Sequence, residues 1–165
     1  MKAGGKNIIC NQIYLFKGKQ VCLPLKKRGF GQGWHNGYGG KVKPDETLEA
    51  SAKRELFEES GVKADIFEKR AVLTFVFLHT GKTIESHIYW CEKFTNMPRE
   101  TDEMQPFWFG FDSVPYGKMW PDDKFWFPKF LAGEKFTGKF EFLDDQPTIG
   151  GYEIKSGMLD KTSSV

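Results

Sequence analysis

The order of strand and helix signals predicts an α+β fold built on a mixed β-sheet. Segments that form hairpins alternate with two helical segments far apart in the sequence, so the sheet is not expected to be purely parallel. A length of 165 residues suits one domain with a substantial core. We predict a single domain over residues 1–155, followed by a small, polar, disordered tail over residues 156–165.

Apolar and alternating stretches predict the strands of this sheet, with glycine-rich or polar turns between them. A glycine-rich loop over residues 26–40 follows the first two strands, and a turn over residues 79–82 closes a hairpin. The strands are expected at residues 8–16, 20–25, 63–78, 83–94, 105–111, 135–143 and 148–154.

Capping residues and an apolar stripe predict the first helix, over residues 48–60. Thr47 or Asp45 can cap its start, and Gly61 can end it in a left-handed conformation. Its stripe has a spacing near four and is formed by Leu48, Ala52, Leu56 and a residue near Ser60.

A second helix is predicted over residues 121–132. Pro121 or Asp122 lies near its start, where a proline is tolerated. Pro128 lies inside this stretch and is expected to kink it or to mark the start of its last part.

Composition excludes several classes of protein. A formal net charge of +2 gives no basis for bulk or stable nucleic-acid binding, and no apolar run has the length of a membrane span. The start of the chain lacks the apolar core of a secretory signal. The widely spaced Cys10, Cys22 and Cys91 indicate reduced, buried thiols. We expect a cytoplasmic protein, with room for a nuclear or mitochondrial pool.

The densest chemical signal is an acidic cluster on the first helix. Glu55 lies three and four residues before Glu58 and Glu59, so all three carboxylates can converge on one patch. Like charges repel at that spacing, whereas Mg²⁺ prefers such oxygen ligands. Arg54 can pair with Glu58, four residues later. Taken alone, the cluster is more often an acidic, solvent-facing helix.

The cluster belongs to a longer pattern of nine fixed positions. The pattern resembles the signature of the Nudix hydrolases, and this resemblance implies a mixed sheet sandwiched between helices, with the glutamate-rich helix beside the cleft. It also implies hydrolysis of a nucleoside diphosphate linked to another group, with Mg²⁺, or Mn²⁺ as a substitute, as cofactor. The nine positions are Gly40, Glu46, Arg54, Glu55, Leu56, Glu58, Glu59, Gly61 and Val62.

Two segments on the N-terminal side of the pattern bear on the substrate. Lys26, Lys27 and Arg28 precede a glycine loop and suit a triphosphate, although a solvated basic turn or an unspecific RNA contact explains them about as well. Asn36 offers a donor and an acceptor for a purine edge. As an asparagine before glycine it is also a strong turn signal.

A third segment lies far downstream. Trp120 can stack on a purine ring, and the adjacent Asp122 and Asp123 can read its edge. Two acids in a half-apolar pocket tend to have one raised pKa, so one can accept a hydrogen bond while the other donates. Aspartates are also favourable at a helix N-terminus, and both interpretations can hold at once.

Together these segments resemble the branch of the Nudix family that hydrolyses oxidised purine nucleoside triphosphates in animals. The resemblance covers about residues 21–142. It implies that the metal is bound by the Gly39 carbonyl and by Glu55, Glu58, Glu59 and Glu103. It implies that the substrate is bound by Asn11, Lys26, Phe30, Asn36, Gly39, Gly40, Phe75, Trp120, Asp122 and Asp123.

The chain departs from that branch at several positions of the cleft wall. Trp34-His35 replaces Arg-Trp, and Tyr38 replaces a phenylalanine. Asn11 falls where a pocket threonine is usual, and Ile84 where a methionine is usual. These departures leave open the preference among oxidised guanine, oxidised adenine and alkylated purines.

We hypothesise a Mg²⁺-dependent enzyme that cleaves oxidised purine nucleoside triphosphates to monophosphate and pyrophosphate and so sanitises the nucleotide pool. Glu59 is the expected base, or the ligand that holds the nucleophile, with Glu55, Glu58 and Arg54 around it. A monomer acting on small molecules is expected. The alternatives are a Nudix enzyme for ADP-ribose, a dinucleotide or an RNA cap, a silent nucleotide sensor, and a general nucleic-acid binder.

Overall fold

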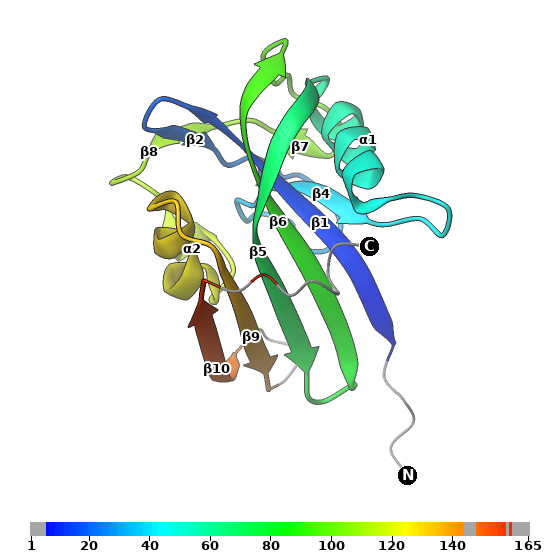
Figure 1. The fold of residues 1–165 in the computed structure, drawn as a ribbon, viewed down its shortest axis with the longest axis vertical. Helices are drawn as coiled ribbons and strands as arrows, with labels where there is room; N and C mark the ends of the chain where they lie inside the picture. The colour runs from blue at the N-terminus through cyan, green and yellow to red at the C-terminus, as the bar shows by residue number, and fades with distance from the viewer. Residues whose placement is uncertain (1–5, 144–147, 158, 160–165) are drawn as a thin grey trace.

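The computed structural model describes residues 6–143, 148–157 and 159, and within them the strands form one large and one small sheet (Figure 1). The eight-stranded sheet runs in the order β10-β9-β5-β6-β1-β2-β8, with β4 also paired to β1, and the small sheet pairs β3 with β7. The strands are β1 (Asn7–Lys17), β2 (Gln20–Cys22), β3 (Leu25–Lys26), β4 (Tyr38–Lys41), β5 (Lys63–Phe77), β6 (Lys82–Thr95), β7 (Met104–Gln105), β8 (Trp108–Gly110), β9 (Phe136–Phe142) and β10 (Ile149–Ser156).

The large sheet is mixed, as predicted. β1 runs parallel to β6 and β5 runs parallel to β9, whereas β5 pairs antiparallel with β6 in the predicted hairpin. β9 and β10 also pair antiparallel. The long strand β5 contains register shifts near Ile66 and Lys69, and irregularities of this kind bend a strand.

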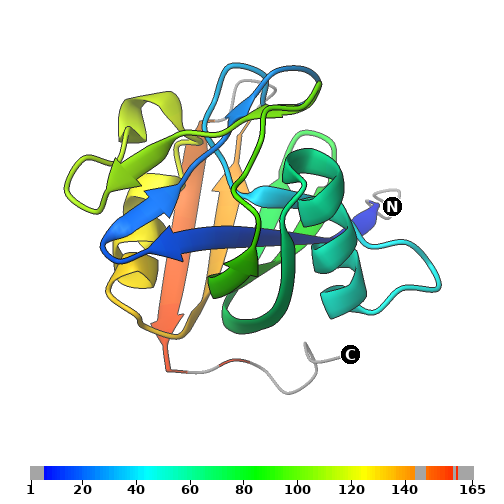
Figure 2. The same cartoon turned by 90° about the horizontal axis from the view of Figure 1, so that it is seen from above.

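Two helices cover the sheet from opposite sides, so the layers are helix, sheet and helix (Figure 2). Alternation along β1 separates the two cores. Tyr14 and Phe16 pack with the residues of α2 (Asp123–Leu131), whereas Ile13 and Leu15 pack with the residues of α1 (Leu48–Ser60). The central strand β1 therefore contributes to both layers, and its one-residue alternation decides which layer a side chain enters.

The first helix has the predicted bounds and caps. The Thr47 hydroxyl accepts a hydrogen bond from the Ala50 N–H at 3.1 Å, and Gly61 ends the helix with a left-handed φ of 77°. Thr47 is therefore the cap, and Asp45 is not. The predicted stripe is buried and faces the sheet, with Leu48, Ala52, Leu56 and Ser60.

Three predicted elements differ from those observed. The strand expected at residues 20–25 is interrupted at Leu23-Pro24, and the strand expected at 105–111 divides into β7 and β8 around Pro106. Both prolines lack the N–H that a continuous ladder needs. A short 3₁₀ helix, Tyr116–Lys118, was not predicted, and α2 starts at Asp123 with Pro128 inside it.

The predicted turn at residues 144–147 lies outside the described residues. β10 extends through Ser156, one residue into the predicted tail, and Lys155 pairs with Thr137 of β9. Residues 158 and 160–165 also lie outside the described part, so disorder there stays a prediction. None of the helices in the described residues is long and apolar enough to cross a membrane.

Candidate active site

A cavity of about 280 Å³ opens between the glycine-rich loop, the start of α2 and the α2-facing side of the sheet. Its wall combines aromatic rings with carboxyl, amide and lysine groups. All ten residues predicted to bind substrate line this one cavity, although they come from segments up to about a hundred residues apart: Asn11, Lys26, Phe30, Asn36, Gly39, Gly40, Phe75, Trp120, Asp122 and Asp123.

Two glycines allow β4 to lie directly against β1 and α1. At Gly39, with φ of 151°, an added Cβ would lie 2.0 Å from the carbonyl oxygen of Asn11. At Gly40 it would lie 2.7 Å from the Glu55 Oε1. The Gly39 N–H donates to the Glu59 Oε1 at 2.8 Å. Any side chain at these positions would push the helix away from the strand and break this contact.

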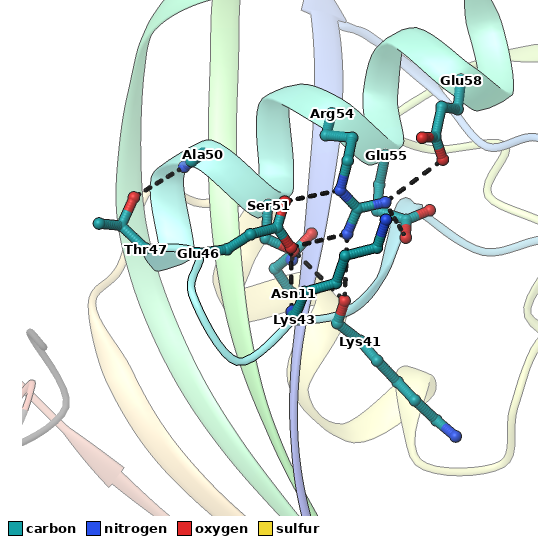
Figure 3. Close-up of polar contacts among 10 residues, drawn as sticks. All are labelled: Asn11, Lys41, Lys43, Glu46, Thr47, Ala50, Ser51, Arg54, Glu55 and Glu58. Carbon is teal, nitrogen blue, oxygen red and sulfur yellow. Dashed lines mark hydrogen bonds and ion pairs between the residues drawn. The ribbon is translucent and has the colours of Figure 1, made fainter.

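Arg54 is the centre of an ion-pair network on α1 (Figure 3). Its Nη1 contacts Glu58 at 3.3 Å, which confirms the predicted pair, and Glu55 at 2.9 Å. The shortest contacts run to Glu46, from Nε at 2.6 Å and from Nη2 at 2.8 Å. Hydrogen bonds from Arg54, and one from the Lys43 backbone, lower the pKa of Glu46 to about 2. The principal partner of Arg54 is therefore Glu46, which the sequence marked only as a motif position.

Glu59 has a different environment. Its side chain is buried, and this burial raises its pKa to about 8, against the opposing effects of the Gly39 N–H and Lys26. The charges of Glu55 and Glu103 raise the pKa further. Burial and the neighbouring carboxylates thus favour the protonated form of Glu59, and a bound cation would favour the carboxylate form that a base needs.

The predicted convergence of Glu55, Glu58 and Glu59 is not present in this structure. Among the described residues, no group of three His, Cys, Asp or Glu side chains is arranged to hold a metal ion. Arg54 holds Glu55 and Glu58, whereas Glu59 bonds to Gly39. Glu103 is paired with Arg28 at 2.9 Å. Arginine side chains therefore pair with Glu55, Glu58 and Glu103, three of the four carboxylates predicted to bind a metal.

The donor set nevertheless fits a hard divalent cation. The pKa of Glu59 is raised by Glu55 and Glu103, so these three carboxylates lie within electrostatic range of one another around the Gly39 backbone. Like charges so placed are costly unless a cation lies between them. All the available donors are oxygens, which Mg²⁺ prefers. Glu58 is the most exposed of the predicted ligands, with 54% of its side chain accessible.

The opposite end of the cavity contains two buried acids. Asp122 and Asp123 are each 3% exposed, and the Asp122 Oδ2 accepts from the Trp126 Nε1 at 2.8 Å. The Asp123 Oδ2 has no hydrogen-bond partner among the described residues. Burial raises the pKa of Asp122 to about 6, and burial with the neighbouring Asp122 charge raises that of Asp123 well above its usual value. At least one carboxyl is therefore protonated near neutral pH and can donate.

Asn36 combines the two interpretations that its sequence context allowed. Its Oδ1 accepts from the Gly37 N–H at 2.9 Å, which makes the turn. The same side chain lines the cavity that holds the two aspartates. Its NH₂ group can therefore serve as a donor toward a ligand while the oxygen holds the loop.

Trp120 stands in an aromatic cluster at the cavity wall. Its ring centroid lies 4.9 Å from that of Phe30 and 4.8 Å from that of Trp34, which packs edge-on. Phe30 is 66% exposed and Lys82 lies 5.5 Å from its ring centroid, at the mouth of the cavity. A flat, polarisable wall of this kind suits a stacked base.

The departures at His35 and Tyr38 lie behind the cavity wall. His35 is buried, with its Nδ1 2.7 Å from the Leu23 carbonyl oxygen, and burial lowers its pKa. Tyr38 is fully buried in the core beneath α1, and burial raises its pKa. Neither side chain lines the cavity, whereas Ile84 does.

Sequence reasoning missed Gln12. Asn11 faces α1, where its Nδ2 donates to the Ser51 Oγ at 2.8 Å, so its amide is engaged away from the base-reading groups. The next residue, Gln12, turns to the α2-facing side, where the Tyr14 hydroxyl donates to its Oε1 at 2.6 Å. Cys10 lines the same wall and is only half-buried, unlike the other two cysteines. Strict alternation along β1 was the available signal.

Comparisons with known proteins agree with this arrangement. The family model described as NUDIX domain matches residues 9–130. The chain is similar to the oxidized purine nucleoside triphosphate hydrolase of Mus musculus, at 42% identity over 143 residues, covering 87% of this chain and 91% of the mouse protein. The protein of the same description from Danio rerio is 44% identical over 123 residues, covering 74% of this chain and 79% of its own length.

Solved structures show the same fold. The crystal structure of the mutator MutT protein from Bacillus halodurans superposes with a TM-score of 0.79 at 22% identity, covering 89% of this chain and 97% of that one. The MutT protein from Methanosarcina mazei gives a TM-score of 0.64 at 19% identity, covering 78% and 93%. At these identities the likeness concerns the fold alone.

Proposed function

The chain belongs to the Nudix hydrolases, and from this premise we propose that it cleaves oxidised purine nucleoside triphosphates to the monophosphate and pyrophosphate. Curated relatives with 42% and 44% identity are named for this activity. The proposed role is to remove damaged purine nucleotides before they are built into nucleic acid. The expected cofactor is Mg²⁺.

One observation carries the substrate assignment: a buried acid pair with raised pKa values faces the same cavity as an asparagine amide and an aromatic wall. Asp122 and Asp123 supply an acceptor and a donor, and Asn36 supplies further donors. A purine edge with ring N–H, amino and oxo groups matches such a set. Trp120 supplies the stacking surface.

The chain divides the reaction between the two ends of the cavity. Lys26 lines the cavity close to Glu59 and provides positive charge for the phosphates. Glu55, Glu59, Glu103 and the Gly39 carbonyl are the groups that would hold a divalent cation, with Glu58 at the exposed side. When bound there, the cation neutralises phosphate charge and lowers the pKa of water.

Glu59 is the proposed proton acceptor. Water attacks a phosphorus atom of the triphosphate chain, Glu59 takes the proton, and the bridging P–O bond breaks to release pyrophosphate. Gly39 fixes the Glu59 carboxylate through its N–H. Arg54 keeps Glu55 and Glu58 in place through the same guanidinium that binds Glu46. Burial of the base end keeps the purine ring dry, so its hydrogen bonds discriminate strongly.

A substrate panel with pyrophosphate readout tests the proposal. We expect kcat/KM for 8-oxo-dGTP to exceed that for dGTP by at least about tenfold, since a buried site penalises unpaired polar groups. Equal values for the two would reject the sanitising role. Activity on ADP-ribose or a dinucleotide, without activity on 8-oxo-dGTP, would assign the chain to another Nudix substrate class.

A further inference from the structure

Gln12 and Ser86 form a polar pair on the cavity floor that the proposed function has not used. They lie on β1 and β6, the two central strands, which run parallel and adjacent. Both side chains line the cavity, and the Gln12 Nε2 lies 3.5 Å from the Ser86 Oγ. The pair shares the cavity with Asn36, Asp122 and Asp123, which stand on the loop and at the start of α2.

The orientation of the Gln12 amide is fixed from behind. Tyr14 is fully buried, with its ring centroid 5.2 Å from that of Phe127 and 5.3 Å from that of Phe130. Its hydroxyl donates to the Gln12 Oε1 at 2.6 Å. An amide oxygen can only accept, so the hydroxyl proton of Tyr14 points to Gln12.

This arrangement makes Gln12 a donor toward the cavity. Its oxygen is engaged by Tyr14, so the NH₂ group carries the remaining hydrogen-bonding capacity. The contact to Ser86 at 3.5 Å lies at the weak limit of a hydrogen bond and does not satisfy that group. Ser86 is 1% exposed, and its hydroxyl can accept as well as donate.

We propose that Gln12 and Ser86 read the imidazole edge of the base, with the Gln12 NH₂ donating to a C8 oxo oxygen and the Ser86 hydroxyl accepting from N7–H. An 8-oxopurine presents this acceptor and this donor side by side. An unmodified purine presents a C8–H, which gives the Gln12 NH₂ no acceptor, and a bare N7, toward which the Ser86 hydroxyl must turn its proton. The pair therefore selects for oxidation at C8, while Asn36, Asp122 and Asp123 read the six-membered ring.

This inference rests on the proposed function, because it assumes a purine in the cavity. It distinguishes purines oxidised at C8 from purines oxidised at C2, which the proposed function does not distinguish. A purine oxidised at C2 retains C8–H and N7, so it lacks the C8 oxygen that the Gln12 NH₂ would bind. We infer that the chain prefers 8-oxopurines to 2-oxopurines, with Gln12 and Ser86 as specificity-determining residues and Tyr14 as a positioning residue.

The test is a set of kcat/KM values for 8-oxo-dGTP, dGTP and 2-oxo-dATP in wild type, Gln12→Met, Ser86→Ala and Tyr14→Phe. Gln12→Met retains length and removes the donor. It should lower kcat/KM for 8-oxo-dGTP by about tenfold, the usual effect of a lost buried hydrogen bond, and leave the other two within about twofold. Ser86→Ala should act in the same direction. Tyr14→Phe should show the same pattern with a smaller loss, since the amide can then rotate.

Gln20→Met is the matched control, because Gln20 is exposed on β2, away from the cavity, and should leave all three values unchanged. Thermal unfolding verifies that each variant is folded. An equal loss on all three substrates, or no loss on 8-oxo-dGTP, would overturn the inference. Calorimetric affinities for 8-oxo-dGMP and dGMP provide a readout that does not depend on turnover.

The two hypotheses fail in different ways. A wild-type chain that hydrolyses none of the triphosphates contradicts the proposed function. A wild-type chain that hydrolyses 8-oxo-dGTP, with its preference unchanged in Gln12→Met, contradicts only the role of Gln12. Tighter binding of 8-oxo-dGMP than of dGMP by wild type, lost in Gln12→Met, supports the reading of the imidazole edge. Equal affinities for the two monophosphates in wild type would overturn it.

Discussion

The carboxylates of α1, which adjoin the cavity beside Gly39, and those at the start of α2, which line it, have opposite environments. On α1, Arg54 pairs with Glu46, Glu55 and Glu58, and the pKa of Glu46 lies near 2, so this carboxylate stays charged. At the start of α2, Asp122 and Asp123 are buried and form no ion pair within the described part of the chain, and burial raises both pKa values. The charged end suits metal and phosphate, and the protonated end suits a neutral base. Carboxyl groups thus differ in charge between the two ends because their environments set different pKa values.

Among the variants considered, the one that removes the proposed proton acceptor should lose the most activity. Glu59→Gln retains the shape and the capacity to accept the Gly39 N–H, but cannot take up a proton. We expect kcat to fall by roughly 10² to 10⁴, with nucleotide binding largely retained. Steady-state kinetics and calorimetric titration with the monophosphate measure the two effects. Glu49→Gln, in the exposed first turn of α1, is the matched control, and a near-normal kcat in Glu59→Gln would remove Glu59 from this role.

Arg54→Lys tests whether the ion-pair network keeps the carboxylates of α1 in position. A lysine keeps the charge but cannot reach Glu46 through two nitrogens while also contacting Glu55 and Glu58. We expect kcat/KM to fall by about 10- to 100-fold, as for residues that orient metal ligands, with base selectivity unchanged. Lys53→Ala, on the same helix, should have no effect. An altered ratio of 8-oxo-dGTP to dGTP hydrolysis would show that the two ends are not independent.

Asp123→Asn tests the protonated end, through the pH dependence of stability. A carboxyl whose pKa is raised on folding contributes stability that is complete below its unfolded pKa and is lost as pH rises through the folded pKa. For Asp122 this window extends from about 3.8 to about 6, and for Asp123 it extends higher. The variant should therefore unfold at a higher temperature than wild type at pH 8, with a gain on the order of 1 kcal/mol, and the difference should shrink toward pH 4.

Selectivity gives a second measurement on the same variant. An amide at residue 123 replaces the donating hydroxyl of a protonated carboxyl by a wider NH₂ group and cannot share a proton with Asp122, so kcat/KM for 8-oxo-dGTP should fall by about tenfold. Hydrolysis at the α1 end should be unaffected. A nucleotide whose binding depends less on contacts to the base should therefore be hydrolysed by the variant at nearly the wild-type rate. A pH-independent difference in melting temperature would contradict the raised pKa of Asp123.

Thr47→Ala should have the smallest effect, because it should change neither the α1 carboxylates nor the base-reading acids. It removes the hydroxyl that caps α1 and should lower the free energy of unfolding by about 1 kcal/mol. For a domain of this size that corresponds to a melting temperature about 2–4 °C lower. Thr47→Ser retains the cap and is the control. A loss of activity beyond about twofold would show that the cap positions Glu59 rather than only stabilising the helix.

The sequence predicted α1 to the residue because its determinants are local. A cap at Thr47, an apolar stripe and a terminating Gly61 all act within one helix. The strand breaks at Pro24 and Pro106 were readable in the same way, from the missing N–H of proline, but were not predicted.

The rest of the site depended on distant contacts. Glu46 reaches Arg54 only because the loop before the helix folds back onto it. Asn11 and Gln12 both line the cavity, but the register of β1 against β6 decides which of the two side chains turns to the α2-facing side, and a one-residue difference exchanges the two faces. The sequence placed Asp123 beside Asp122 in a half-apolar pocket with one raised pKa, but it did not show how fully both are buried, since periodicity gives no measure of desolvation.

The three free thiols bear on how long such a protein keeps working under oxidative stress. Cys10 lies on the cavity wall, where an adduct would block the site. Burial raises its pKa, and raises those of Cys22 and Cys91 to about 11. Because oxidants attack the thiolate rather than the thiol, these sulfurs react slowly. The proposed substrates of this enzyme arise by oxidation, and its own cysteines are slow to be oxidised under the same conditions.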